Sequence, residues 1–292
     1  MKIELAREYG MCFGVRDALE AATKAAEAGP VTVLGEIVHN PVAAARLRAR
    51  GAGEGHLDDV ESARTKRVLV TAHGASEQDR ERWRHAGHAL IDTTCPLVRR
   101  AHAALKAFVR EGRHPVVVGR KGHVEVMGLI GDFPGATVLE GENDIASLPR
   151  EGALGIVSQT TQPLSHVREV VEHVRRLHPH RDIGFRDTVC QPTKDRQKAL
   201  EELCLRVEIV VVVGGRNSHN TRQLVASARA MDRRTEQVER ADELRADWFQ
   251  GLERVGVTAG TSTLEETVRE VVAALHQIDT VRSVGDCAGA VR

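Results

Sequence analysis

Three of the five cysteines occupy similar places in the sequence, each directly after a short apolar run. Cys12 follows the first run of the chain, whereas Cys95 and Cys190 close two related segments, Asp92-Thr-Thr-Cys-Pro and Asp187-Thr-Val-Cys-Gln-Pro. Thiolates are the usual protein ligands of iron–sulfur clusters. Three of them could hold a cubane of four irons and leave one iron open, as a Lewis acid and a port for electrons.

The other two cysteines are predicted to be non-ligands. Cys204 shares a helical face with Leu200 and Leu203, which indicates a place in the core, and Cys287 lies close to the C-terminal end. The odd count and the absence of any Cys-x-x-Cys pair argue against a disulfide framework and against a zinc ribbon.

A second set of polar side chains also follows strand-like runs. It combines neutral hydrogen-bonding groups with three imidazoles, and backbone N–H groups at helix N-termini would join them. Such donors match the oxygens of a phosphate without a cluster of lysines. The set comprises His39, His73, His123, Thr160, Thr161, Ser218, Asn220 and Ser262. The sequence therefore predicts a pocket for a polyanion.

Glu125 stands two residues after His123, at the mouth of the same predicted crevice. Partial desolvation of a carboxyl group raises its pKa, which allows the group to deliver protons near neutral pH. We therefore expect Glu125 to act as a proton donor.

The elements that position these residues follow a regular order. Short β-branched runs end in a small or polar cluster, and an amphipathic stretch follows each of them, as in parallel α/β proteins. Open α/β sheets bind ligands at the carboxyl ends of their strands. The predicted strands are the opening segment 1–5 and the runs 31–35, 67–72, 114–119, 153–158, 208–213 and 254–258.

Spacing indicates an internal repeat. Cys12 precedes His39 by 27 residues, and the intervals from Cys95 to His123 and from Cys190 to Ser218 are both 28 residues. Three similar units would each offer one cysteine and two polar loops. We predict three α/β lobes in a pseudo-threefold arrangement around a central cluster. The predicted lobes are 1–95 with Cys12, His39 and His73, 96–190 with His123, Glu125 and Thr160, and 191–292 with Ser218, Asn220 and Ser262.

Composition excludes several classes of function. Basic and acidic residues number 41 each, so the formal net charge is zero and no broad basic field attracts nucleic acid. Aromatic residues make up only 3%, too few for base-stacking platforms. No run of about 18 apolar residues occurs, and the first residues resemble a strand rather than a signal peptide. We expect a cytoplasmic protein that binds neither nucleic acid nor membrane.

Nine motifs together resemble those of the LytB/IspH family, the hydroxymethylbutenyl diphosphate reductases. They occur in the family's order and at compatible spacing from about residue 3 to residue 282. The motifs are Gly10-Met-Cys12-Phe-Gly-Val, Val38-His39-Asn40-Pro41, Ala72-His73-Gly74, Thr93-Thr-Cys95-Pro96, Gly122-His123-Val-Glu125, Gln159-Thr160-Thr161, Cys190 with Arg196-Gln197, Asn217-Ser218-His-Asn220 and Ala259-Gly-Thr-Ser262.

The resemblance implies one 4Fe-4S cluster per chain in an enzyme of the non-mevalonate (MEP) isoprenoid pathway. Such an enzyme removes the hydroxyl of 4-hydroxy-3-methylbut-2-enyl diphosphate with two electrons and protons, and yields isopentenyl and dimethylallyl diphosphates. Ferredoxin or flavodoxin would supply the electrons. Carried over by position, Cys12, Cys95 and Cys190 would be the cluster ligands.

Roles for the polar residues also follow from the resemblance. Glu125 would be the proton donor, with Thr160 or Thr161 orienting it and the substrate hydroxyl. The groups that grip the diphosphate would be His39, His73, His123, Ser218, Asn220 and Ser262.

The sequence departs from the usual family motifs at a few positions. His219 replaces a serine within Asn-Ser-Ser-Asn, and Thr261 replaces an alanine. Of these, only His219 falls on an expected ligand position. Because an imidazole can still donate one hydrogen bond to phosphate, we expect altered affinity rather than loss of function.

Two alternatives remain open from the residues alone. A zinc hydrolase of a small diphosphate could use His39, His73, His123 and Glu125, although it would leave the three cysteines unexplained. A non-catalytic diphosphate-binding redox sensor would keep the pocket but would not need Glu125. Metal content separates the first from the reductase, and turnover separates the second.

Overall fold

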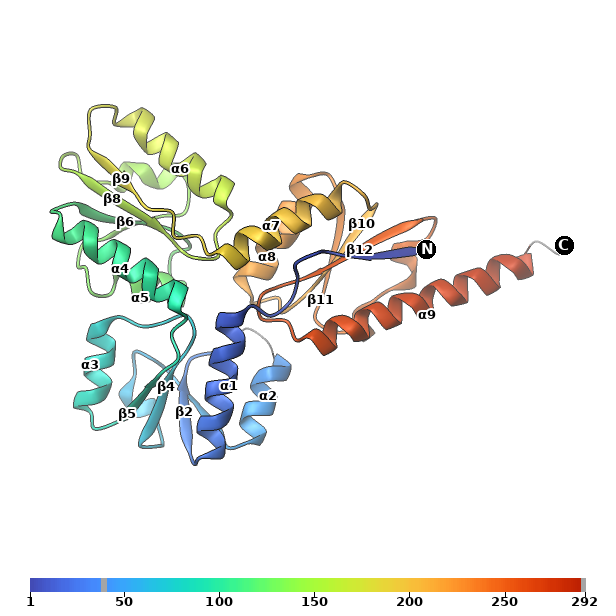
Figure 1. The fold of residues 1–292 in the computed structure, drawn as a ribbon, viewed down its shortest axis with the longest axis horizontal. Coiled ribbons are helices and arrows are strands. Elements are labelled where there is room, and N and C mark those ends of the chain that lie inside the picture. Colours follow the sequence, from blue (N-terminus) through green and yellow to red (C-terminus); the bar gives the residue numbers. More distant parts are fainter. Residues whose placement is uncertain (38–40, 290–292) are drawn as a thin grey trace. The chain divides into compact units, whose positions relative to one another are not determined.

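The computed structural model describes residues 1–37 and 41–289, which form three four-stranded sheets flanked by helices (Figure 1). Every strand pair in the sheets is parallel. The predicted α/β fold with three lobes is therefore confirmed. Contacts divide the described residues into two compact units, which we call unit 1 (residues 1–12, 41 and 192–289) and unit 2 (residues 13–37 and 42–191).

Unit 2 contains two of the sheets. The first has the order β3-β2-β4-β5, with β2 (Val31–Leu34), β3 (Ala52–Gly55), β4 (Arg67–Val70) and β5 (Ala89–Asp92). The second has the order β7-β6-β8-β9, with β6 (His114–Val118), β7 (Thr137–Leu139), β8 (Leu154–Ser158) and β9 (Ile183–Phe185). The helices of this unit are α1 (Phe13–Glu27), α2 (Pro41–Ala49, whose first residue is assigned to unit 1), α3 (Glu77–His85), α4 (Pro96–Arg110), α5 (Val124–Ile130) and α6 (Leu164–Leu177).

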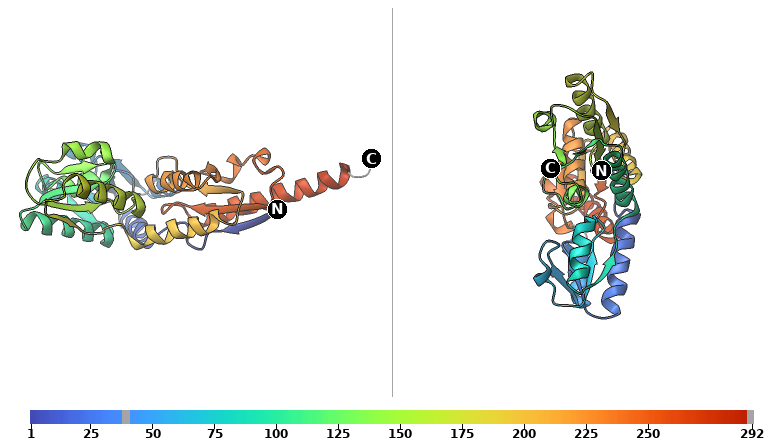
Figure 2. Two further views of the ribbon diagram at one scale, coloured as in Figure 1. Left: turned by 90° about the horizontal axis from the view of Figure 1, so that it is seen from above. Right: turned by 90° about the vertical axis from the view of Figure 1, so that its left-hand side faces the viewer.

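Unit 1 contains the third sheet, in the order β1-β12-β10-β11. Its strands are β1 (Lys2–Leu5), β10 (Ile209–Val213), β11 (Arg234–Val238) and β12 (Arg254–Ala259), and its helices are α7 (Gln191–Cys204), α8 (His219–Ala230) and α9 (Glu265–Gly289). Figures 1 and 2 show α9 as a single unbroken helix. Short 3₁₀ turns lie at Val60–Ser62, Glu142–Ser147, Ala241–Glu243 and Ala246–Phe249.

The predicted boundary of the first lobe is wrong at its N-terminal end. Strand β1 pairs with β12 from Lys2 to Leu5, so it completes the third sheet and not the first. Cys12, which follows β1, therefore belongs with the third sheet. Each sheet thus has three consecutive strands plus a fourth that leads to a cysteine, and in the third sheet the N-terminal strand supplies this fourth place.

Each sheet is buried on both faces, which explains its continuous apolar strands. The central strand β10 reads Ile-Val-Val-Val-Val, and all five residues are buried. One face of the third sheet packs against α7 and α8 through Leu200, Leu203 and Leu224, and the other face packs against α9 through Val268 and Val271. A parallel sheet covered in this way leaves its carboxyl-end loops as the place for polar groups.

The two sheets of unit 2 are joined through contacts near α3 and α5. The Asp132 carboxylate accepts the backbone N–H groups of Glu77 and Gln78 at 2.9 and 3.0 Å, at the start of α3. A negative charge at a helix N-terminus is favourable because the N–H groups there have no partner in the helix. Gly128 approaches Ala75 so closely that an added Cβ would lie 3.3 Å from the Ala75 Cα.

Within the described ranges, no helix is both long and apolar enough to cross a membrane.

Candidate active site

The same backbone hydrogen bond fixes each of the three predicted cluster cysteines. In every case the cysteine N–H donates to the carbonyl of the second residue beyond the end of the neighbouring parallel strand. The bonds run from Cys12 to Thr261, from Cys95 to Ala72 and from Cys190 to Thr160, with N···O distances of 3.1, 3.0 and 3.0 Å. The repeat inferred from spacing is therefore present as a repeated backbone geometry.

The two cysteine loops of unit 2 also share a turn made by an aspartate. Asp92 Oδ1 accepts the N–H of Thr94 at 2.9 Å, and Asp187 Oδ1 accepts the N–H of Val189 at 3.1 Å. Aspartate side chains favour such turns because they accept from the backbone two residues further along. The repeated Asp-Thr-x-Cys pattern is therefore the signal for this turn, although the sequence alone did not reveal a role for these aspartates.

The threonines of the same motif tie each loop to the neighbouring strand. Thr93 Oγ1 donates to the Val70 carbonyl, and Thr188 Oγ1 donates to the Ser158 carbonyl, both at 2.6 Å. Each cysteine of unit 2 is thus held by the aspartate turn, the threonine hydroxyl and its own N–H. This local order reduces the conformational freedom that metal binding would otherwise have to remove.

The Cys95 loop carries an ionic network. Arg80 Nε and Arg99 Nη2 lie 3.2 and 3.0 Å from Asp92 Oδ2. Burial disfavours the Asp92 carboxylate, but hydrogen bonds from Thr94 and the charges of Arg80 and Arg99 outweigh it and lower the pKa of Asp92. Asp92 is therefore ionised at neutral pH and holds α3 and α4 to one loop.

The environment of the thiols separates Cys204 from the other described cysteines. Cys12, Cys95 and Cys190 are partly exposed, whereas Cys204 is buried among the leucines of α7. A Cβ on Gly14 would lie 2.4 Å from the Cys95 Sγ, so only glycine leaves room beside that thiol. Accessible thiols at strand ends fit an iron–sulfur group, and a buried thiol does not. The side chain of Cys287 lies outside the described residues.

The three predicted cluster cysteines do not all belong to the same unit. Cys12 belongs to unit 1, whereas Cys95 and Cys190 belong to unit 2. Among the residues with described positions, no three His, Cys, Asp or Glu side chains form a group that could hold one metal ion. His39, a predicted phosphate ligand and also a member of the alternative zinc set, lies outside those residues. Its assignment stays a prediction.

Glu125 lies in the first turn of α5 and is only 1% exposed. Its Oε1 accepts the backbone N–H of Thr160 at 2.6 Å, which joins the start of α5 to the loop after β8. Burial raises the pKa of Glu125 to about 7, although hydrogen bonds from the Thr160 backbone and side chain act in the opposite direction. A carboxyl group with this pKa exchanges its proton near neutral pH, which suits a general acid.

His123 caps the N-terminus of α5, where its Nδ1 accepts the backbone N–H of Glu125 at 3.1 Å. In the neutral ring this contact leaves the proton on Nε2. The ring of His73 meets that of His123 edge to face, with centroids 5.7 Å apart and an interplanar angle of 79°. Two predicted phosphate ligands from neighbouring sheets of unit 2 therefore lie side by side.

Gln159 is a buried polar residue whose role is not evident from the sequence. Its Oε1 accepts the N–H of Arg120 at 3.1 Å, and its Nε2 donates to Thr161 Oγ1 at the same distance. Gln162 Nε2 adds a third bond to Gln159 Oε1 at 3.3 Å. Gln159 therefore connects the loop after β6 to the loop after β8, which carries Thr160 and Thr161.

Unit 1 presents neutral donors at its strand ends. Ser218 caps α8, where its Oγ accepts the N–H of Thr221 at 3.3 Å, and its hydroxyl proton remains able to donate. Asn220 Oδ1 accepts the N–H of Thr261 at 3.0 Å, which orients the amide so that its NH₂ group faces away from that bond. Ser262 is also buried. None of these side chains titrates near neutral pH.

His219, the departure from the family motif, occupies the first position of α8 and is buried. Its Nε2 lies 3.4 Å from Nε2 of Gln223, one helical turn further along. This contact provides a partner for the ring that a serine could not reach. Its role as a phosphate ligand stays a prediction.

Comparisons with known proteins give a consistent result. A family model described as LytB protein matches residues 3–276. The 4-hydroxy-3-methylbut-2-enyl diphosphate reductase of Dehalococcoides mccartyi (strain CBDB1) is 38% identical over 286 residues, which cover 95% of this chain and 99% of that protein. The reductase of the same name from Geobacter sulfurreducens is 36% identical over 281 residues, covering 96% and 98%.

Solved structures agree with these sequence relatives. The E-1-hydroxy-2-methyl-but-2-enyl-4-diphosphate reductase from Plasmodium falciparum aligns with a TM-score of 0.87 at 27% identity, over 93% of this chain and 87% of that one. A structure of (E)-4-hydroxy-3-methyl-but-2-enyl diphosphate reductase aligns with a TM-score of 0.68 at 32% identity, over 95% and 100%. The similarity therefore includes all three sheets.

Proposed function

The chain belongs to the LytB protein family, and on this premise we propose that it is a 4-hydroxy-3-methylbut-2-enyl diphosphate reductase, the terminal enzyme of the non-mevalonate pathway. The reaction removes the allylic hydroxyl with two electrons and two protons and yields isopentenyl and dimethylallyl diphosphates. The observation that carries this proposal is similarity over nearly the whole chain, combined with a buried Glu125 whose pKa is raised to about 7.

Family membership implies an iron–sulfur cofactor, and we assign its ligands to Cys12, Cys95 and Cys190. Their partial exposure, their equivalent hydrogen bonds and the space that Gly14 leaves beside Cys95 support the assignment. When bound, a 4Fe-4S cluster with three protein ligands supplies electrons and one open Lewis-acidic iron. Electrons would reach it from a ferredoxin or flavodoxin.

Glu125 supplies the proton for the leaving hydroxyl. Because Thr160 N–H occupies Oε1, we place the transferable proton on Oε2. The pKa of about 7 keeps a large fraction of Glu125 protonated at neutral pH, and the Thr160 hydrogen bonds stabilise the carboxylate that remains after transfer. Gln159 keeps the loop of Thr160 and Thr161 in register with the loop after β6.

The donors to the diphosphate are assigned by their positions in the sequence. On unit 2, His73 and His123 present imidazole N–H groups. His39, which lies outside the described residues, is assigned the same role by sequence position alone. On unit 1, Ser218, Asn220 and Ser262 present hydroxyl and amide protons, with His219 beside them. Such neutral donors bind phosphate oxygens without a lysine cluster. The binding energy of this remote group holds the alcohol for reduction.

Anaerobic preparation of the full chain provides the test. We expect about four iron and four sulfide per chain. With reduced methyl viologen and 4-hydroxy-3-methylbut-2-enyl diphosphate, both isoprenoid diphosphates should form. Colourless protein that contains zinc would contradict the proposal, and so would brown protein that binds the substrate without converting it.

A further inference from the structure

Helix α4 differs in charge from the two other helices that directly follow a predicted cluster cysteine. It contains four basic residues and no acidic one: Arg99, Arg100, Lys106 and Arg110. By contrast, α1 contains two basic and three acidic residues, and α7 contains three of each. The three helices occupy equivalent places in the repeat, so the repeat itself does not account for the charge of α4. In a chain with zero formal net charge, it forms a local positive surface.

Most of this charge is not used inside unit 2. Arg99 pairs with Asp92 at 3.0 Å and donates to the Thr94 carbonyl at 3.3 Å. Arg100, Lys106 and Arg110 are exposed, and none of them has a hydrogen-bond or ion-pair partner among the residues that the structure describes. Unpaired guanidinium and ammonium groups on one helix are available to an external anionic partner.

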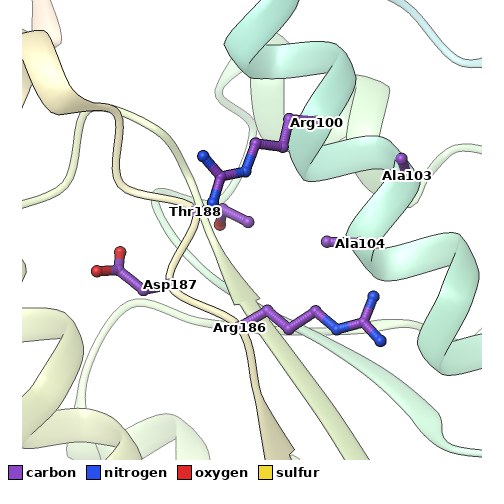
Figure 3. A pocket seen from close by; sticks show the side chains of 6 residues that line it. All are labelled: Arg100, Ala103, Ala104, Arg186, Asp187 and Thr188. Atoms are coloured by element: carbon purple, nitrogen blue, oxygen red, sulfur yellow. The ribbon is translucent and has the colours of Figure 1, made fainter.

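A cavity of about 540 Å³ lies beside this face, between α4 and the segment that follows β9 (Figure 3). Figure 3 shows Arg100 and Arg186 on opposite sides of the hollow, with Ala103 and Ala104 forming the α4 wall. The Arg186 guanidinium lies over the Phe108 ring at 4.7 Å, and its Nη2 is 3.1 Å from Glu111 Oε1. Stacking and the ion pair therefore hold the Arg186 guanidinium in place at the hollow.

Both segments that line the cavity are close in sequence to a predicted cluster ligand. Helix α4 begins at Pro96, immediately after Cys95, so Arg100 lies roughly 8 Å along the helix axis from that residue. The opposite wall contains Thr188, two residues before Cys190. All of these residues belong to unit 2. A molecule bound to this face would therefore lie beside the two segments that carry thiols.

We infer that the exposed basic face of α4, together with the cavity between Arg100 and Arg186, is the docking surface for an acidic one-electron carrier protein. The inference rests on the proposed function, because the reductase needs electrons from outside the chain. Two reduced carriers each give up one electron while one C–O bond breaks and one C–H bond forms. Two protons are consumed and the hydroxyl leaves as water. A carboxylate-rich carrier surface complements α4 in charge.

The test compares two electron sources on the full, cluster-loaded chain. The variant is Arg100→Glu combined with Lys106→Glu, which reverses two unpaired charges of α4. Its control is Arg168→Glu on α6 combined with Lys198→Glu on α7, two exposed residues that do not line the cavity. Turnover is measured with reduced methyl viologen, a small dye, and with a reduced acidic ferredoxin at several salt concentrations.

We expect the α4 variant to raise the KM for ferredoxin by about tenfold or more and to flatten its salt dependence, since charge steering changes association rates by such factors. Dye-supported turnover should stay within about twofold of wild type, and the control should behave as wild type in both assays. An unchanged ferredoxin KM, or an equal effect in the control, would overturn the docking surface while leaving the reductase assignment intact. Loss of dye-supported turnover in the wild type would instead overturn the function itself.

A small anion is the other possible occupant of the cavity. If inorganic phosphate inhibited dye-supported turnover of the wild type and the Arg100→Glu/Lys106→Glu variant lost that inhibition, the cavity would be an anion site and the docking proposal would be wrong. Dye-supported turnover that does not respond to phosphate in either protein would support the docking surface.

Discussion

The strand ends of the two units are built alike but carry different chemistry. In unit 2 they present His73, His123 and Glu125, a carboxyl group whose pKa is raised to about 7 by burial. In unit 1 the corresponding loops present the neutral donors Ser218 and Asn220, with the imidazole of His219 between them in sequence and no carboxyl group equivalent to Glu125. Under the proposed roles, the proton donor therefore belongs to unit 2, although both units use one repeated backbone.

The shared backbone is visible at the helix starts. Gly119 and Gly214 each follow a central strand and donate their N–H to the end of the neighbouring strand, both at 2.9 Å. Four residues later, His123 caps α5 and Ser218 caps α8. A single side-chain difference at equivalent caps therefore exchanges a titratable group for a neutral one. The scaffold fixes the position, and the residue type decides the chemistry.

The largest effect is expected at the three cysteines, which occupy equivalent positions in the repeat. Replacement of Cys12, Cys95 or Cys190 by Ser should abolish the cluster, because each removes one of three anchors. Cys204→Ser is the control and should retain iron, since Cys204 is buried in the core of unit 1. Iron and sulfide analysis of anaerobic protein measures the outcome. Full iron retention in any of the first three variants would remove that cysteine from the ligand set.

The Glu125→Gln variant tests whether Glu125 is the proton donor. Glutamine keeps the shape and can still accept from Thr160, but it has no transferable proton. We expect kcat to fall by about 10²–10⁴-fold, the usual contribution of general acid catalysis. The KM and the iron content should change little. Turnover within about threefold of wild type by folded, iron-loaded protein would show that Glu125 is not the acid.

The same residue should give unit 2 a distinctive pH dependence of stability. The pKa of Glu125 is raised from 4.5 to about 7, so between these values the folded chain holds a proton that the unfolded chain has released. The free energy of unfolding should therefore fall as the pH rises through this window, by roughly 2–3 kcal/mol.

Denaturant unfolding of the cluster-free chain at pH 4.5 and 7 measures this change. Glu125→Gln should remove the fall, whereas Glu169→Gln, which alters an exposed carboxyl on α6, should keep it. A wild type and a Glu125→Gln variant with the same pH slope would mean that Glu125 is ionised when buried.

Ser218→Ala removes one of the neutral hydrogen-bond donors of unit 1 and should have the smallest effect. It removes one hydrogen bond to a charged group, so we expect the KM for the substrate to rise about tenfold with kcat nearly unchanged. Ser76 is a matched control, because it caps α3 in the same way and is equally buried at 2% exposure. Ser76→Ala should cost similar stability without a change in KM. A collapsed kcat in Ser218→Ala would instead assign Ser218 to the chemistry.

Much of the fold could be predicted because buried parallel strands leave a local signature. Runs such as Ile209–Val213 are apolar at every position, since helices cover both faces of their sheet. The positions of the cysteines and of Glu125 relative to these runs followed from sequence. The lobe boundaries after Cys95 and Cys190, and the individual phosphate contacts, stay predictions.

The placement of β1 shows where local sequence information ends. Lys2–Leu5 reads as a strand, but four residues at a sheet edge do not encode their partner, which lies about 250 residues away in β12. The same applies to Asn220 and Gln159. Their orientations depend on which strand ends adjoin, and no neighbour in sequence reveals that.

By itself, the sequence determined the element types, the three cysteines at strand ends and the presence of a carboxylate beside His123, because periodicity and spacing are local properties. Only the tertiary structure decided that β1 closes the third sheet, that Asp92 and Asp187 make equivalent turns, and that Glu125 is buried against Thr160. The physical reason is that burial and hydrogen bonding between distant loops set a pKa, and both arise only when separate strand ends come together.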